Sequence, residues 1–153
     1  MSVEERVKEL NLELPPAPEP LGVYRPVLVS GKTAYTSGHG PVNSDGSLIV
    51  GRVGEELDRR AGFDAARQTG LAVLASLRAE LGSLNRVKRV VKTLGMVNCA
   101  LDFKEHPAVV NGFSELMVEV FGRENGIGAR SAVGVGSLPG NIPVEIEAVF
   151  EID

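Results

Sequence analysis

Apolar and acidic residues alternate near the end of the chain, from Val144 to Ile152. Successive side chains on a strand point to opposite faces, so this pattern predicts a strand with one buried and one acidic face. The buried face would carry Ile146, Ala148, Phe150 and Ile152, and the acidic face Glu145, Glu147 and Glu151.

The residues before this strand predict a further strand and a turn. Residues 131–136 are small or β-branched, which is typical of a strand that packs closely against another element. Residues 138–143 contain the Pro, Gly and Asn that favour a turn. If the two strands paired as a hairpin, Arg130 would lie near the far end of the second strand. A partner for Glu145 would then have to come from a neighbouring strand or from a second subunit.

Two longer segments repeat apolar residues with the spacing of a helix. The first runs from about Leu57 to Leu81 and the second from Pro107 to about Val120, and a glycine follows each pattern. Between them, residues 87–100 predict a strand that bends at Gly95.

The first third of the chain predicts short elements. Ser2 and Glu5 have the spacing of a capping box, which indicates a short helix, and the Pro-rich residues 15–20 end it. Residues 26–36 predict a hairpin, and residues 48–50 a short strand.

The order of these elements is typical of an α+β fold with a single sheet and two long helices on one face. We expect residues 1–20 to form a helix and a linker, and residues 21–153 to form a single domain.

Charge and cysteine content exclude several classes of function. The net charge is −4, which disfavours nucleic acid or an anionic membrane as a partner. The basic cluster at residues 86–92 alternates with valines, as on the wet face of a strand. The single Cys99 excludes an internal disulfide, and His39 and His106 are too far apart in sequence to suggest a metal site. Without a signal-peptide pattern or a membrane-length apolar run, a cytoplasmic protein is expected.

Arg130 is the first candidate for a functional residue. It stands among glycines and other small residues, which would let a ligand approach closely. Its planar guanidinium suits a carboxylate. A structural salt bridge to Glu145 or Glu147 is the alternative.

Glu145 is the second candidate. A carboxylate at this position could act as a general acid or base, or could position a water molecule. Alternatively, the three acids of the last strand form a solvated face, and Glu147 remains a second candidate for the same role.

Several residues in the first third of the chain could line a cleft. Tyr24 precedes a strand, and Ser37 and Gly38 stand at a strand end. His39 lies between two glycines and could be a donor or base in a pocket, because the unperturbed pKa of histidine is about 6.5. For Tyr24, ordinary packing is the alternative.

The C-terminal pieces Ala129-Arg130-Ser131, Leu138-Pro139 and Val144 to Ala148 form a recognisable set. Matching pieces upstream are Gly22 to Tyr24, Thr36 to Gly38, Pro41 to Asn43, and Asn111. On these residues the chain, from about residue 20 to its end, resembles the Rid/YjgF family of reactive-intermediate (enamine/imine) deaminases. The helix at residues 1–20 is an addition to the compact members of that family.

The resemblance implies a homotrimer with clefts between subunits, and hydrolysis of small amino-acid-derived imines to 2-keto acids and ammonia without a cofactor. It implies that Arg130 holds the substrate carboxylate and that Glu145 orients the attacking water. The substrate-binding residues that it implies are Tyr24, Ser37, Gly38, Asn111 and Ala132. Many relatives carry cysteine where this chain has Ala132.

Other functions remain open at this point. A protein of the same fold could bind a small carboxylate metabolite without turnover. Ribonuclease activity is disfavoured by the acidic balance of the chain and the lack of a paired histidine set. A chorismate-mutase-like reaction is disfavoured because its dianionic substrate needs more cationic residues than this motif supplies.

Overall fold

The computed structural model describes all residues from Met1 to Asp153. Its centre is a single five-stranded sheet with the order β1-β2-β5-β3-β4. The strands are β1 (Val27–Ser30), β2 (Thr33–Thr36), β3 (Val87–Asn98), β4 (Ala129–Val135) and β5 (Val144–Ile152). All neighbours are antiparallel except β3 and β4, so the sheet is mixed.

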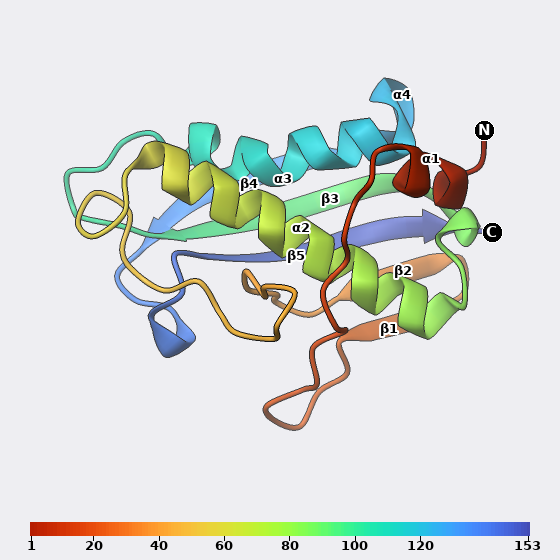
Figure 1. The fold of residues 1–153 in the computed structure, drawn as a ribbon, viewed down its shortest axis with the longest axis horizontal. Helices are drawn as coiled ribbons and strands as arrows, with labels where there is room; N and C mark the ends of the chain where they lie inside the picture. Colours follow the sequence, from red (N-terminus) through yellow and green to blue (C-terminus); the bar gives the residue numbers. More distant parts are fainter.

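Two long helices, α2 (Arg59–Leu81) and α3 (His106–Phe121), lie together on one face of this sheet (Figure 1). The expected α+β architecture is therefore confirmed. Asp58 caps the start of α2, and Gly82 ends it in the left-handed conformation. Pro107 stands in the first turn of α3, as its sequence position predicted.

The last two strands do not pair as a hairpin, so the arrangement considered for Arg130 and Glu145 is not formed. β4 and β5 lie on opposite sides of β3, and both pair with it. The long β3 lies between β5 and β4, and α3 provides the crossover that a parallel β3–β4 pair requires. The predicted turn is present as the short 3₁₀ helix η2 (Pro139–Asn141), but it leads the chain past the end of β3.

Two smaller expectations also change. The register of β3 is regular at Gly95, and its irregularities lie between Val87 and Lys92. Gly95 is instead a point of close approach, because a Cβ there would be 2.6 Å from the side chain of Val110. The short strand expected at residues 48–50 is reduced to a single bridge between Leu48 and Val42. The predicted hairpin at residues 26–36 is confirmed as β1 and β2.

The predicted N-terminal helix is α1 (Val3–Glu9), and its capping box between Ser2 and Glu5 is formed. Glu4 accepts hydrogen bonds from Arg78 Nη2 at 2.6 Å and from Leu84 N at 2.9 Å. Val7 is buried against the main core. These contacts fix α1 next to the end of α2 and to the 3₁₀ helix η1 (Leu84–Arg86). Residues 15–26 then run to β1, and we call this segment the arm.

The core fills the space between the sheet and the two long helices. Its largest fully buried side chains include Phe113, Phe150, Leu74, Leu77 and Leu116. The helices approach each other at glycines. A Cβ on Gly70 would meet Leu116 at 2.7 Å, and a Cβ on Gly112 would clash with the backbone of Phe63. The short helix α4 (Arg123–Gly126) follows α3.

No helix lies over the other face of the sheet. The acidic side chains of β5 are on this face, together with the half-exposed Tyr35 and Val133. Leu94, Met96 and Val149 share this face and are only partly buried. None of the helices has the length and apolar composition that crossing a membrane requires.

We expect Gly112→Ala to lower the free energy of unfolding by about 2–3 kcal/mol, because the added methyl meets backbone that cannot move without separating the two helices. Urea unfolding measures this change. Gly136→Ala is the matched control, because nothing lies within 4 Å of a Cβ there. Equal stabilities of the two variants would contradict the close-packing argument.

Candidate functional site

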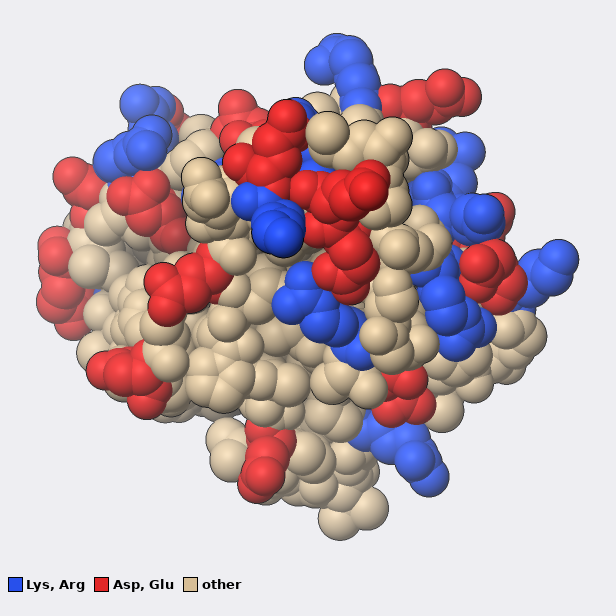
Figure 2. Space-filling view, turned by 45° about the vertical axis from the view of Figure 1, so that its right-hand side comes forward, with Lys and Arg blue, Asp and Glu red and all other residues tan.

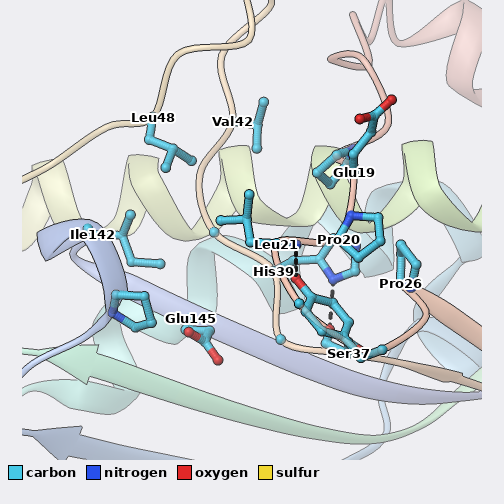
Figure 3. Close-up of a pocket in the computed structure, with 17 residues that line it drawn as sticks. Glu19, Pro20, Leu21, Pro26, Ser37, His39, Val42, Leu48, Ile142 and Glu145 are labelled. Atoms are coloured by element: carbon cyan, nitrogen blue, oxygen red, sulfur yellow. Dashed lines mark hydrogen bonds between the residues drawn. The ribbon is translucent and has the colours of Figure 1, made fainter.

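The predicted site residues gather at two separate hollows of the chain. The first has a volume of about 560 Å³ and lies between the arm, the end of β2 and the start of β5. Its lining includes Tyr24, Ser37, Gly38, His39 and Glu145 (Figure 3). We call it the arm hollow.

The second hollow has a volume of about 480 Å³ and lies between α3, α4 and the edge strand β4. Its lining includes Asn111 and Arg130. We call it the arginine hollow. Ala132 lines neither hollow and packs partly buried against the core.

Glu145 is a partly buried acid without a partner. Its side chain lies against the α-carbon of Gly38, where a Cβ would overlap the carboxylate. It forms no hydrogen bond through its carboxylate and no salt bridge. Burial raises the pKa of Glu145, and the charge of Glu147 raises it further. Glu145 therefore takes up a proton more readily than an exposed glutamate.

Arg130 is a partly desolvated cation without an acidic partner. Its Nη1 donates to Asn111 Oδ1 at 2.7 Å and to Ser114 Oγ at 3.2 Å. No carboxylate lies within 4.0 Å of it, so the alternative of a salt bridge to Glu145 or Glu147 within the chain is not realised. Burial lowers the pKa of Arg130, because the charged form loses hydration. The contacts orient the guanidinium and leave Nη2 and Nε for a ligand.

Comparison with known proteins gives the family. Residues 4–142 match the family described as "YjgF/chorismate_mutase-like, putative endoribonuclease". The chain belongs to this family. The predicted resemblance to Rid/YjgF proteins is thus confirmed.

Individual relatives extend over nearly the whole chain. Protein TCP17 of Trypanosoma cruzi is 40% identical over 99% of this chain and 94% of its own length. The 2-iminobutanoate/2-iminopropanoate deaminase of Dermatophagoides farinae is 27% identical over 93% of this chain and 95% of its own. A crystal structure from Shewanella oneidensis MR-1, described as a "putative endoribonuclease", has a TM-score of 0.94 at 30% identity and covers 99% of this chain and 100% of its own. The matches to the first and third relatives cover α1 and the arm.

In this family member, Arg130 and Glu145 cannot meet within one chain. On β3, which pairs with both strands, Thr93 stands opposite Arg130 and Met96 opposite Glu145. Thr93 and Met96 are three positions apart, so they point to opposite faces of the sheet. Arg130 faces α3, whereas Glu145 is on the face that no helix covers.

At the arm hollow, the hydroxyl of Ser37 is already hydrogen-bonded within the chain, whereas the N–H of Gly38 is free. Ser37 Oγ donates to the carbonyl of Arg25 at 2.6 Å, and this bond ties the arm to the end of β2. The N–H of Gly38 has no protein acceptor. It is therefore a donor that a ligand next to Glu145 could use. The Tyr24 hydroxyl accepts from Leu21 N at 3.2 Å, which fixes the tip of the arm.

His39 is held as a structural residue. Its Nδ1 is 2.7 Å from the carbonyl of Ser37, which can only accept, so this nitrogen carries the proton. Its Nε2 then accepts from Ser76 Oγ of α2 at 2.8 Å. Both ring nitrogens are used, and the ring is buried. His39 is therefore not placed as a base in the pocket. It holds the Ser37–Gly38 backbone in position instead.

Some residues of the two hollows escaped the sequence analysis. Ser114 supports Arg130 together with Asn111, and their spacing of three residues on a helix is the signal that could have indicated it. Leu21 of the arm, Leu48 of the loop after β2 and Ile142 before β5 also line the arm hollow, and no local pattern marks them. The structure has no group of three or more His, Cys, Asp or Glu side chains that could hold a metal ion.

Charges of both signs are mixed on the surface. Figure 2 shows Lys and Arg interspersed with Asp and Glu on the face in view, and the lower part of that face carries few charges. Seven salt bridges join many of these residues. On the right of this view several Lys and Arg side chains lie close together, with Asp and Glu among them.

We expect stability to fall as the pH drops below about 6.5, because burial lowers the pKa of His39 in the folded chain while the unfolded residue titrates near 6.5. Above this pH His39 is neutral in both the folded and the unfolded chain. Below it, only the unfolded chain takes up the proton until the folded pKa is reached. The slope can approach about 1.4 kcal/mol per pH unit.

Urea unfolding between pH 7.5 and 5 tests this dependence. His39→Asn should lack this part of the slope, whereas Ser76→Ala keeps the imidazole and should retain most of it. An identical pH slope in wild type and His39→Asn would show that another group is responsible.

Proposed function

We propose that this protein hydrolyses small enamine or imine intermediates derived from amino acids, giving a 2-keto acid and ammonia. We place the reaction in a cleft formed by the arm hollow of one copy and the arginine hollow of another. The similarity to the 2-iminobutanoate/2-iminopropanoate deaminase of Dermatophagoides farinae supports this reaction class.

One observation carries the proposal. Arg130 and Glu145 are partly desolvated, carry opposite charges when ionised, and have no charged partner within 4.0 Å. Leaving such groups unpaired costs free energy of folding, so a fold that keeps two of them is typical of a binding or catalytic site. A substrate with a carboxylate at one end and an imine at the other would engage both.

In the proposed reaction, Arg130 binds the substrate carboxylate and Glu145 moves protons. Glu145 takes a proton from water as the water oxygen bonds to the imine carbon, and returns it to the imine nitrogen. The C–N bond of the resulting carbinolamine then breaks. Glu145 takes the hydroxyl proton and passes it to the departing ammonia. The raised pKa of Glu145 suits a group that both accepts and donates a proton.

The remaining residues position the substrate. The free N–H of Gly38 lies beside Glu145 and would hold the nitrogen end or the attacking water. Ser37 lines the same hollow and could contribute only the second lone pair of its carbonyl, because its N–H donates to the carbonyl of Pro26. Asn111 would keep Arg130 oriented. Tyr24 would close the arm hollow over the substrate. Ala132 is on the edge strand β4, whose outward N–H and C=O groups have no strand partner, and these would contact the ligand.

We also propose that the working assembly is a homotrimer. Arg130 and Glu145 are on opposite faces of one sheet, so a site that uses both needs a second copy. The uncovered sheet face offers Tyr35, Leu94, Met96 and Val133 for that contact. Three copies around a closed axis would bury this face and form three equal clefts. The proposed chemistry requires no cofactor.

We expect Glu145→Gln to lower kcat by about 10²–10⁴-fold, because the amide cannot relay a proton. Arg130→Ala should lower kcat/KM by a similar factor, because the substrate loses its anchor. Release of the keto acid from a freshly generated imine, with semicarbazide as a competing trap, measures both.

A protein that only binds a carboxylate would behave differently. It would not accelerate release, and only Arg130→Ala would weaken ligand binding. Glu151→Gln is a suitable control, because Glu151 is an exposed acid of the same strand outside both hollows.

Mixing the two inactive variants tests the shared cleft. Subunits of Arg130→Ala and Glu145→Gln should regain activity when they are unfolded and refolded together, because some clefts then combine an intact arginine with an intact glutamate. For random assembly about one quarter of the clefts are complete. The double variant Arg130→Ala/Glu145→Gln, refolded with either single variant, should regain none. No recovery in trimers that contain both single variants would contradict the proposed cleft.

A further inference from the structure

The arm hollow has a fixed apolar floor. Ile142 and Val42 are 5% and 8% exposed. The side chain of Ile142 lies on Gly40, where a Cβ would be 2.8 Å from its Cδ1. Asn98 Nδ2 donates to the carbonyl of Ile142 at 3.1 Å, and Gln68 Nε2 donates to the carbonyl of Val42 at 2.6 Å. The floor is therefore tied to β3 and α2.

The rim of the same hollow is apolar and largely uncovered. Leu48 is 43% exposed, and Leu21 at the tip of the arm is 93% exposed. Figure 3 shows Leu48 and Val42 in the upper part of the view, Ile142 at the left, Leu21 near the middle, and Glu145 and Ser37 in the lower part. The apolar end thus lies beside the residues proposed to act on the imine carbon.

The charges lining the arm hollow also limit which substrate side chains its apolar end can bind. The lining contains no lysine or arginine, and its only acids are Glu19 and Glu145. Both ring nitrogens of His39 already form hydrogen bonds within the chain. A substrate with an acidic side chain would find no cation there, and an apolar side chain would find Leu21, Leu48 and Ile142.

We propose that the arm hollow is the side-chain subsite of this enzyme and selects imines with a bulky apolar side chain, such as those derived from leucine, methionine or phenylalanine. This inference rests on the proposed deaminase function. The volume of about 560 Å³ is within the range of roughly 300–1,000 Å³ that accommodates ligands much larger than an alanine-derived imine.

Burial of exposed leucines is the physical basis of the selection. A leucine-sized side chain would remove apolar surface of Leu21 and Leu48 from water, and the methyl of an alanine-derived imine would not reach both. Each additional methylene in an apolar pocket is worth about tenfold or more in kcat/KM. The exposed arm would thereby determine specificity, although it supplies no reacting group.

The test compares imines generated by an amino-acid oxidase from alanine, leucine, phenylalanine, glutamate and lysine. Each is measured as kcat/KM in competition with semicarbazide. The wild type should prefer the leucine and phenylalanine imines over the alanine imine by about tenfold or more. Leu48→Ser and Leu21→Ser should reduce this ratio several-fold, because the leucine and phenylalanine imines lose more kcat/KM than the alanine imine does. Val23→Ser is the matched control, because Val23 is fully exposed on the same arm but does not line the hollow.

The outcomes separate the two proposals. If no imine is hydrolysed faster than in buffer, the deaminase function fails, and the subsite fails with it. If imines are hydrolysed but the alanine imine is preferred, or the ratio is unchanged in both leucine variants, only the subsite is overturned. A preference for the lysine imine that Glu19→Gln abolishes would also overturn it, and would assign the hollow to basic side chains.

Discussion

The position of β3 between β4 and β5 is the constraint on which the proposed chemistry depends. Because β4 and β5 both pair with this strand, the register of β3 decides where their side chains point. Arg130 is paired to a residue that faces the helices, and Glu145 to a residue that faces away from them. A strand cannot turn a single side chain to the other face without losing its register. The two groups are therefore separated by the sheet itself, and a second copy is the simplest way to join them.

The helix layer then determines how precisely the residues of each half of the proposed cleft are held. On one side, α3 presents Asn111 and Ser114 to Arg130. On the other side, α2 presents Ser76 to His39, which in turn holds the carbonyl of Ser37. Close packing at glycines such as Gly112 fixes the two helices relative to each other. The core thus supports both hollows through short chains of hydrogen bonds.

The N-terminal segment adds a wall that the sheet and helices do not provide. α1 is fixed by Glu4 and Val7, and the arm is tied at its end by Ser37. Between these anchors the arm projects with Leu21 and Val23 exposed. Apolar side chains without packing partners are available for contact with a ligand or a neighbouring copy. In the proposed subsite, substitutions in this segment would change specificity without changing the fold.

The sequence alone determined the type and order of the main elements. The alternation in residues 144–152, the helical spacing in residues 57–81 and the capping box at Ser2 depend on local geometry, and each predicted its element correctly. The family resemblance also singled out Arg130 and Glu145. Tertiary structure alone decided that β4 and β5 lie on opposite sides of β3, that Gly95 makes room for Val110, and that both nitrogens of His39 are occupied. These facts depend on contacts between segments distant in the chain, and local periodicity carries no information about which strands become neighbours.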